Sequence, residues 1–347
     1  MVVKTAAPAG TGLKRFKAAR DKGSEYLRSI QREDGSFPGV ERGAGAYWGI
    51  PIALYVGGHS AGANRLFRWI RKNAFTAEGD IGPSPAEATF HHYAYEKSWL
   101  IEGAHRLAQF DLSQKGTDFM LRMWDEESGG FFSSATERSA DTKMDLWINS
   151  GSARALLYTG RLDVARATAR WMKNLMDLQP NYPEQLYPVW SKAKGLITEP
   201  EMDDRSRDYR FPADWRYVLN QKAERDQTFF NPGIAGGFLA RLYQSTGETE
   251  WLDLAKRYML LAEGASDFQF RTLRAGKTGW GASALYTITG EDKYGEMATR
   301  IGDNIIAMQD DQGFWSGAIE TSDTPSINLG AEMVVWLDEI HQAVGEE

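Results

Sequence analysis

A segment that recurs along the chain constrains the fold more than any other feature of the sequence. Residues 22–37, KGSEYLRSIQREDGSF, combine an amphipathic helix with a glycine-containing turn and a final aromatic residue. Similar segments occupy residues 115–131 and 300–315. Repetition of this kind indicates an architecture that is built from copies of one supersecondary unit.

The spacing of the turns gives the size and number of these units. The turns that close a unit fall near Gly35, Gly82, Gly130, Gln179, Gly264 and Gly313. Their consecutive differences are 47, 48, 49, 85 and 49 residues. A period of about 48 residues suits a hairpin of two helices with its loops, and the long interval is one period plus about 37 further residues. We therefore predict an all-α (α/α)6 toroid of six hairpins, formed by a single domain over residues 1–347, rather than an open solenoid.

Two patterns divide the predicted helices into an outer and an inner ring. Outer helices carry the one-sided apolar stripe of a solvent-facing helix, and we expect them at residues 14–32, 61–72, 113–124, 162–178, 250–264 and 293–309. Inner helices contain internal Gly and Ala, which let helices crowd around an axis although Gly costs about 1 kcal/mol in a helix. We expect inner helices from about residue 46, and at residues 86–108, 141–159, 228–245, 272–289 and 325–343.

The additional residues of the long interval form an insertion at 182–225. This segment is rich in aromatic, charged and proline residues and lacks sustained helical periodicity. A long non-helical excursion from a compact domain is usually a functional lid or binding loop, and we predict a lid-like insertion here. The alternative is a surface hairpin or a contact between the subunits of a homodimer.

The repeated segment resembles the QW motif of terpene cyclases. The matching positions are Lys22, Gly23, Tyr26, Leu27, Gln31 and Gly35 with the aromatic Phe37 in place of Trp, and Gln309, Gly313 and Trp315, which keep the Trp. The resemblance covers the repeat scaffold, hence most of the chain, and implies a toroid like those of terpenoid cyclases and protein prenyltransferases, in which the motifs tie outer helices to the following turns.

The sequence also departs from that family. The acidic DxDD motif of class II terpene cyclases is absent, and the chain has one toroid where triterpene cyclases have two. Six-hairpin glycosidases, uronyl hydrolases and sugar epimerases share the architecture, so the fold does not determine the function.

Composition excludes several kinds of protein. The net charge is −7, with acidic and basic residues interspersed, so no basic surface for nucleic acid is expected. No apolar run reaches the ~18–20 residues of a membrane span, and the first dozen residues lack the apolar region of a signal peptide; we expect a cytoplasmic protein. The absence of cysteine excludes disulfides, thiolate nucleophiles and Cys-ligated zinc, and with it the zinc-dependent lanthipeptide cyclases.

Candidate site residues gather where the inner helices begin. Residues at i and i+4 share a helix face, and four inner helices carry such polar pairs: Glu87/His91, Asp145/Asn149, Gln227/Asn231 and Asn328/Glu332. We predict Asp145 or Glu87 as the catalytic acid and His91 or His92 as a proton relay, since His titrates near neutral pH. The other interpretation is that the two carboxylates only favour the start of a helix.

Aromatic and amide side chains accompany these pairs, and a concave aromatic cavity with a few polar groups is typical of a small-molecule site. The predicted substrate-binding residues are Tyr47, Trp48, Tyr93, Trp147, Asn149, Gln227, Phe230, Asn231, Trp280 and Asn328.

Other motifs point away from cofactors. No GxGxxG or complete phosphate-binding loop is present, and no cluster of metal ligands is evident. Residues 58–62, GHSAG, match the GxSxG nucleophile elbow, but that motif requires a strand and a sheet; between two helices it predicts a tight turn. We expect acid–base chemistry without a cofactor or metal.

Three functions remain open. The first is a cyclase, isomerase or lyase acting on a terpenoid- or polyketide-like molecule, whose positive charge the aromatic rings would favour. The second is a carbohydrate enzyme, either a glycoside hydrolase, a polysaccharide lyase or a sugar epimerase, with Trp stacking on sugar rings and paired carboxylates for hydrolysis. The third is a toroid that binds a small molecule without catalysis.

Overall fold

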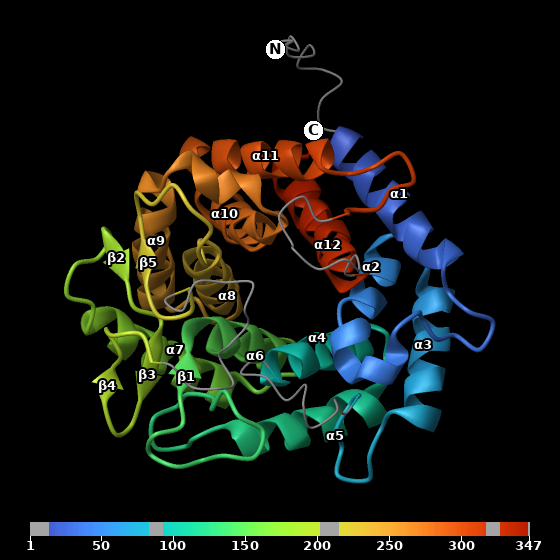
Figure 1. Ribbon diagram of the computed structural model, residues 1–347, viewed down its shortest axis with the longest axis horizontal. Coiled ribbons are helices and arrows are strands. Elements are labelled where there is room, and N and C mark those ends of the chain that lie inside the picture. The colour runs from blue at the N-terminus through green and yellow to red at the C-terminus, as the bar shows by residue number, and fades with distance from the viewer. Residues whose placement is uncertain (1–13, 83–92, 202–214, 317–326, 346–347) are drawn as a thin grey trace.

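The protein forms a closed double ring of helices, shown by the computed structural model in Figure 1. The structure describes residues 14–82, 93–201, 215–316 and 327–345. The inner ring consists of α2 (Ile50–Val56), α4 (Tyr93–Arg106), α6 (Leu146–Tyr158), α8 (Asn231–Thr246), α10 (Gly276–Thr289) and α12 (Ile327–Val344). Each inner helix packs on the next, and α12 packs on α2, so the ring closes. The predicted (α/α)6 toroid is confirmed, and the open solenoid is excluded.

The outer ring alternates with the inner one along the chain. Its helices are α1 (Lys14–Ser29), α3 (Ser60–Asn73), α5 (Phe110–Met120), α7 (Leu162–Asp177), α9 (Thr249–Gly264) and α11 (Asp292–Ala307). The apolar stripe of an outer helix faces the inner ring: in α3 the buried side chains include Leu66, Phe67 and Ile70. In contrast, α6 is buried from Ile148 to Leu156 on all faces.

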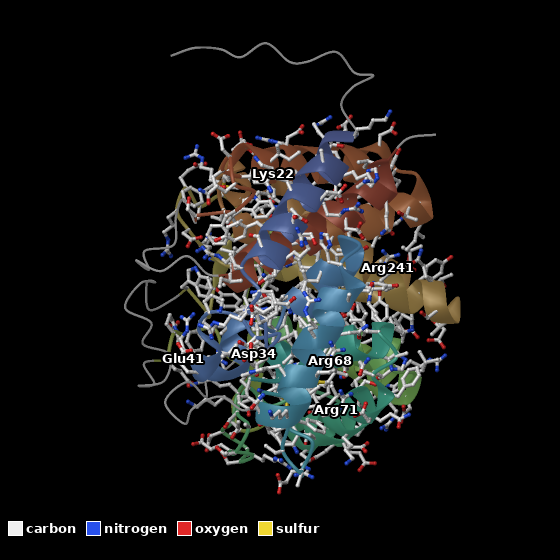
Figure 2. All side chains as sticks on the ribbon, turned by 90° about the vertical axis from the view of Figure 1, so that its right-hand side faces the viewer. Lys22, Asp34, Glu41, Arg68, Arg71 and Arg241 are labelled. Atoms are coloured by element: carbon white, nitrogen blue, oxygen red, sulfur yellow. The ribbon has the colours of Figure 1, made fainter. Side chains whose placement is uncertain are left out.

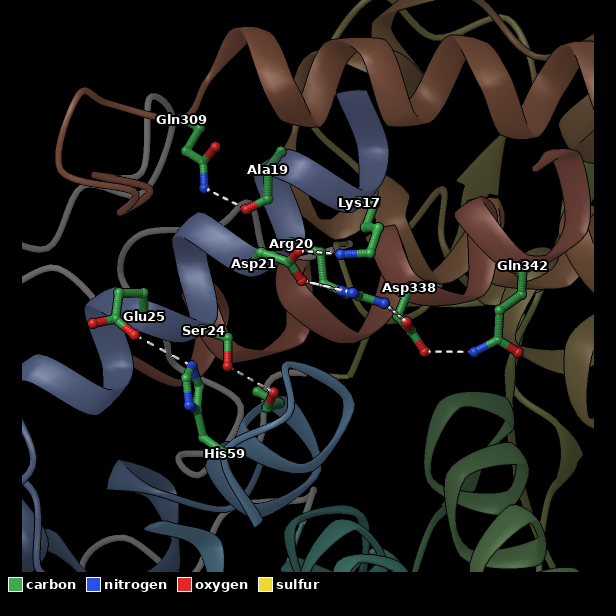
Figure 3. A network of polar contacts seen from close by, with 11 residues as sticks. Lys17, Ala19, Arg20, Asp21, Ser24, Glu25, His59, Gln309, Asp338 and Gln342 are labelled. Carbon is green, nitrogen blue, oxygen red and sulfur yellow. Dashed lines mark hydrogen bonds and ion pairs between the residues drawn. The ribbon is translucent and has the colours of Figure 1, made fainter. Parts of the chain in front are cut away.

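Two glutamines of the repeat, Gln31 and Gln309, each tie an outer helix to the turn that follows it. The Gln31 amide donates to the carbonyls of Gly35, at 3.0 Å, and Gly62, at 2.9 Å. In the same way the Gln309 amide donates to the Gly313 carbonyl at 3.0 Å and to the Ala19 carbonyl at 2.9 Å. The bond to Ala19 is drawn in Figure 3. Each glutamine therefore joins its own turn to the next outer helix, as the repeat predicts.

Glycine is required in these turns for two reasons. Gly313 has a φ of 96°, and a Cβ there would lie 2.5 Å from the Lys22 carbonyl oxygen. Gly35 has a φ of 92° and would meet the Arg65 carbonyl oxygen at the same distance. A side chain at either position would strain the turn and separate it from the next outer helix.

Three inner helices begin at least four residues later than the sequence predicts, and α8 begins three residues later. Ahead of α2, residues Val40–Ala46 form a 3-10 helix that is interrupted at Gly43, whose φ of 77° is not helical. Met144 and Asp145 form a strand, so α6 begins at Leu146 rather than at residue 141. Before α10 the chain forms 3-10 turns at Asp267–Arg271 and Leu273–Ala275. A further 3-10 turn, Leu121–Met123, ends the third outer helix early.

The described part of the insertion contains no helix, which confirms its predicted non-helical character. Strand β1 (Met144–Asp145) pairs with β3 (Val189–Ser191), which pairs with β4 (Gly195–Leu196), all antiparallel. Strand β2 (Gln185–Leu186) pairs with β5 (Leu219–Asn220) in a second antiparallel sheet. Val189, Ile197 and Tyr217 form a small apolar cluster between these strands. The lid function of this segment stays a prediction.

The axis of the ring has two distinct ends. We call the end at which the inner helices begin the mouth end, and the opposite end the far end. Figure 2 shows Glu41, which precedes α2, and Arg241, near the end of α8, at opposite sides of the molecule. Within the described residues, no helix is long and apolar enough to cross a membrane.

Candidate active site

Three ion pairs between buried or partly buried side chains lie near the beginnings of α6, α10 and α12, at the mouth end. Arg216 Nη2 lies 3.1 Å from Asp145 Oδ2, and Arg274 Nη2 lies 2.5 Å from Asp226 Oδ2. The third pair joins Lys277 Nζ to Glu332 Oε2. Arg216 and Asp226 belong to the end of the insertion or follow it directly, so two of these pairs fasten that segment to the inner ring.

The pair of Lys277 and Glu332 is the most deeply buried of the three. Lys277 stands one residue into α10 and is 2% exposed, whereas Glu332 lies in the second turn of α12 and is 4% exposed. The Trp336 indole N–H donates to Glu332 Oε2 at 3.2 Å. The Lys277 ammonium lies 5.2 Å from the centre of the Phe230 ring. A carboxylate and an ammonium group are thus held together in apolar surroundings.

A continuous series of aromatic side chains surrounds this pair. Trp48 contacts Tyr95 and Trp99, with ring centres 5.4 and 4.9 Å apart. Tyr95 contacts Trp147 at 5.2 Å, and Trp147 contacts Phe230 at 5.1 Å. The series extends through Trp215 on one side and through Trp336 and Trp280 on the other. These residues come from all six inner helices, or from the residues directly before them, and from the insertion.

Tyr95 adds a protonated hydroxyl beside the ion pair. Burial raises the pKa of Tyr95 well above its usual value, the Glu332 carboxylate raises it further, and Arg154 partly opposes both effects. The phenol therefore stays protonated at neutral pH. Its oxygen is buried and has no hydrogen-bond partner among the described residues. A buried hydroxyl without a partner is costly and calls for an explanation, such as a catalytic role or a bound water.

Asp145, the predicted acid, forms a helix cap at the mouth end. Its Oδ1 accepts a hydrogen bond of 2.9 Å from the Ile148 amide, and its Oδ2 faces Arg216. The side chain satisfies one of the open amides at the start of α6. Both carboxylate oxygens are therefore engaged by the protein, as the helix-start interpretation expects. Its catalytic role stays a prediction.

Three of the predicted binding amides form hydrogen bonds to the backbone, and their role in substrate binding stays a prediction. Asn149 bonds to both the amide and the carbonyl of Phe131, at 2.7 and 3.3 Å. Gln227 does the same with Asn220, at 2.9 and 3.0 Å. Asn328 accepts from the Gly49 amide at 3.1 Å and donates to the Gly45 carbonyl. Asn231 differs, because its buried Oδ1 has no partner among the described residues.

The predicted aromatic residues divide between two locations. Trp48, Trp147, Phe230 and Trp280 belong to the aromatic series around the ion pair. Tyr47 instead points toward the outer ring, where it packs against Trp69 of α3. The Tyr93 hydroxyl donates to Asp80, away from the series. Glu87, His91 and His92 lie outside the described residues, so their predicted roles stay predictions.

Several residues of the site were not among the predicted ones. They are Tyr95, Trp99, Arg154, Arg216, Lys277 and Trp336, together with Glu332, which the sequence places in a polar pair without a role. The i, i+4 spacing could have found most of them: Tyr95 precedes Trp99 by four residues, and Glu332 precedes Trp336 by four. Lys277 had a different signal, as a charged residue among the small ones of GKTGWGASA.

The GHSAG motif is a turn between α2 and α3, as predicted. Gly58 has a φ of 85°, His59 caps α3, and Ser60 is its first residue. The His59 ring lies 3.4 Å from Glu25 of α1 (Figure 3). No strand of the described chain adjoins this turn.

Comparison with solved structures identifies the fold. The chain adopts a six-hairpin toroid. It is similar to a D-mannose isomerase, with a TM-score of 0.70, 14% identity and coverage of 97% of this chain and 100% of that one. It is also similar to the GH76A α-1,6-mannanase from Salegentibacter sp. HEL1_6, with a TM-score of 0.63, 12% identity and coverage of 95% and 99%.

A third similar structure is an unsaturated glucuronyl hydrolase specific for heparin, with a TM-score of 0.59, 12% identity and coverage of 96% and 99%. No family model and no curated protein sequence matches the chain. These neighbours belong to the six-hairpin class named above as the alternative. They do not support the resemblance to terpenoid cyclases; in this chain the glutamine–glycine turns join neighbouring hairpins.

Proposed function

We propose that this protein is a carbohydrate-active enzyme that isomerises or epimerises a reducing sugar by proton transfer. The observation that carries the proposal is the buried pair of Lys277 and Glu332 beside the protonated Tyr95 hydroxyl. Isomerisation next to a carbonyl requires a base for the proton on carbon and donors for the carbonyl oxygen. Glu332 supplies a carboxylate, Lys277 an ammonium group and Tyr95 a phenol within one apolar site.

Each group takes one role in the proposed reaction. Glu332 removes the proton from the carbon beside the carbonyl, and Lys277 or Tyr95 gives a proton to the carbonyl oxygen, which yields an enediol. The Glu332 carboxyl then returns the proton to the former carbonyl carbon. The hydroxyl on the neighbouring carbon gives its proton to the donor and becomes the new carbonyl, which completes the isomerisation. Trp48, Trp147 and Phe230 supply apolar faces for the sugar ring. The structural similarity to a D-mannose isomerase supports this class of reaction.

Glycoside hydrolysis is the second candidate. It requires two carboxylic groups on either side of the bond to be cleaved, about 5–9 Å apart. Asp145 and Asp226 both lie at the mouth end, but each faces an arginine. An inactive variant of the similar mannanase has two consecutive aspartates replaced. Here Asp310 and Asp311 are consecutive, but Asp310 caps an outer turn through the Gln312 and Phe314 amides; residues 203 and 204 lie outside the described chain.

The test is a panel of reducing monosaccharides, mannose included, incubated with the enzyme in D2O and followed by proton NMR. We expect loss of the C2 proton signal together with the appearance of an isomer. Glu332→Gln should lower the rate by about 10²–10⁴-fold, the usual contribution of a general base. Glu339→Gln, on the same helix at the far end and paired with Arg241, is the matched control and should retain activity.

The same samples should be given α-1,6-linked mannooligosaccharides. Release of reducing ends without any exchange at C2 would reject the isomerase and favour the hydrolase. Unchanged exchange in folded Glu332→Gln protein would reject the role of Glu332.

A further inference from the structure

Arg154 lies behind the proposed catalytic pair, on the side toward the far end. Its side chain comes from the third turn of α6 and is buried, with 4% of the residue exposed. Its guanidinium carbon lies 4.2 Å from the centre of the Trp99 ring, 5.3 Å from Trp280 and 5.6 Å from Trp336. Three indoles from three different inner helices therefore enclose one cation.

The charge of Arg154 is only partly satisfied by polar groups. Its Nε lies 2.7 Å from Glu102 Oε2, but Glu102 also pairs with Arg106 at 3.0 Å. The Nη2 atom is buried and has no hydrogen-bond partner among the described residues. A buried ion pair is seldom better for stability than apolar residues of the same volume. The presence of a charged, incompletely bonded side chain at this position points to a role other than filling space.

One of the three indoles connects Arg154 to the catalytic pair. The Trp336 ring lies against the guanidinium on one side, while its N–H donates to Glu332 Oε2 on the other. Trp99 and Trp280 contact the same ring, with centres 5.2 and 5.7 Å away. The orientation of the Trp336 N–H is thus set by the group of rings that Arg154 holds together, because a cation attracts the face of an aromatic ring.

We propose that Arg154 is a positioning residue: by holding the Trp336 indole between Trp99 and Trp280, it fixes the N–H that orients the Glu332 carboxylate. The kinetic part of this inference rests on the proposed function, whereas the structural link from Arg154 through Trp336 to Glu332 does not. Loss of Arg154 leaves Glu102 paired with Arg106, so Arg154→Met removes the guanidinium without leaving an unpaired buried carboxylate.

The kinetic test compares Arg154→Met, Arg154→Lys and the control Arg106→Met. Arg106 shares Glu102 but stacks on Tyr158 instead of on the three indoles. A small displacement of a catalytic group can cost about 10²-fold in rate, so we expect kcat of Arg154→Met to fall at least about tenfold while KM changes less than about twofold. Arg154→Lys should recover part of the loss, since it keeps a cation, and Arg106→Met should match the wild type.

A second measurement reads the hydrogen bond directly. The exchange of the Trp336 indole proton with solvent deuterium is followed in ¹⁵N-labelled protein, and the signal is identified by its loss in Trp336→Phe. Exchange should be faster in Arg154→Met and in Glu332→Gln than in the wild type, and unchanged in Arg106→Met. Unchanged protection in Arg154→Met, or a loss of kcat that Arg106→Met shares, would overturn the proposal. If the wild type turns over no sugar, the proposed function fails, but the exchange measurement still decides the structural link.

Discussion

At the outer-ring turns, glutamine side chains bond to backbone carbonyls, whereas the mouth end combines bonds to the backbone with ion pairs between side chains. Gln31 lies in the first hairpin and Gln309 in the sixth. Each joins the carbonyl of its own turn to a carbonyl of the next outer helix. The three ion pairs of the mouth end differ from one another in their residues and in the elements that supply them. The outer turns are therefore periodic, and the mouth end is not.

This difference separates stability from function. The bonds of Gln31 to Gly62 and of Gln309 to Ala19 each fix the packing of one hairpin on the next. A buried ion pair contributes little to stability relative to apolar residues of the same size, so we expect the pair of Lys277 and Glu332, which the aromatic series surrounds, to serve a function. Changes at the two regions should then act on different properties.

The largest effect is expected from breaking the buried pair at the mouth end. Glu332→Gln leaves the Lys277 ammonium buried without its carboxylate and should destabilise the fold by about 3–5 kcal/mol. The double variant Lys277→Met/Glu332→Met should recover most of this loss in urea-induced unfolding, while it stays inactive in the C2 exchange assay. A double variant as unstable as the single one would show that the pair stabilises the ring after all.

The next effect concerns an outer turn. Gly313→Ala forces a side chain onto a φ of 96° and to within 2.5 Å of the Lys22 carbonyl oxygen. Strain of this kind together with a steric clash costs about 3 kcal/mol. Gly290→Ala is the matched control, since Gly290 has a φ of 67° but no atom within 4 Å of an added Cβ; about 1 kcal/mol is expected there.

Thermal unfolding of the two glycine variants distinguishes backbone conformation from close approach. Equal losses in both would mean that the left-handed conformation alone, rather than contact with α1, requires glycine at position 313. The folded fraction of either variant should keep its turnover number, because neither glycine adjoins the pair of Lys277 and Glu332.

The periodic part of this molecule was predictable from its sequence, and the local reason is visible at Gln309 and Gly313. Their bonds depend on backbone atoms that every hairpin presents in the same way, so the spacing of a few residue types reveals the ring and most helix bounds to within a few residues. The late start of α6 escaped prediction because it depends on β1 pairing with β3, which lies more than forty residues further along the chain.

The candidate site was only partly predictable, for a related reason. Asp145 and Asn149 were correctly placed where an inner helix begins, but the contacts of Asp145 with Arg216 and of Asn149 with Phe131 depend on which segments of other hairpins and of the insertion fold back on them. Lys277 and Glu332 meet across two neighbouring inner helices, and a spacing rule within one helix cannot show such a pair. Their roles, and those of Glu87, His91 and His92, stay predictions.

A smaller effect is expected from removing one glutamine of the repeat. Gln309→Ala loses the bonds to Ala19 and Gly313, each worth about 1 kcal/mol, and should lower the free energy of unfolding by about 2 kcal/mol. Gln312→Ala, an exposed position in the same turn, is the control and should be neutral in the same urea titration. Similar stability of the two variants would show that the glutamine of the repeat does not hold the turn.

The smallest effect is a loss of stability at alkaline pH, which we expect for buried tyrosines of both the outer and the inner ring. Burial raises the pKa of Tyr258 in the outer ring and of Tyr95 in the inner ring well above the usual value of 10.0. Their contribution to stability is therefore complete below pH 10 and is lost above it, since the unfolded chain ionises first. Each such tyrosine should cost about 1.4 kcal/mol per pH unit above 10.

Chemical unfolding at pH 9, 10 and 11, with tyrosinate absorbance recorded in parallel, measures this loss. Tyr258→Phe and Tyr95→Phe should each reduce the alkaline slope by the same amount, because each removes one tyrosine that ionises only on unfolding. Their activities at neutral pH should differ, since only Tyr95 adjoins the proposed catalytic pair, whereas Tyr258 donates to the Met172 carbonyl at 2.7 Å between two outer helices. Equal slopes with unequal turnover would separate the two regions by function alone; equal turnover would remove Tyr95 from the proposed site.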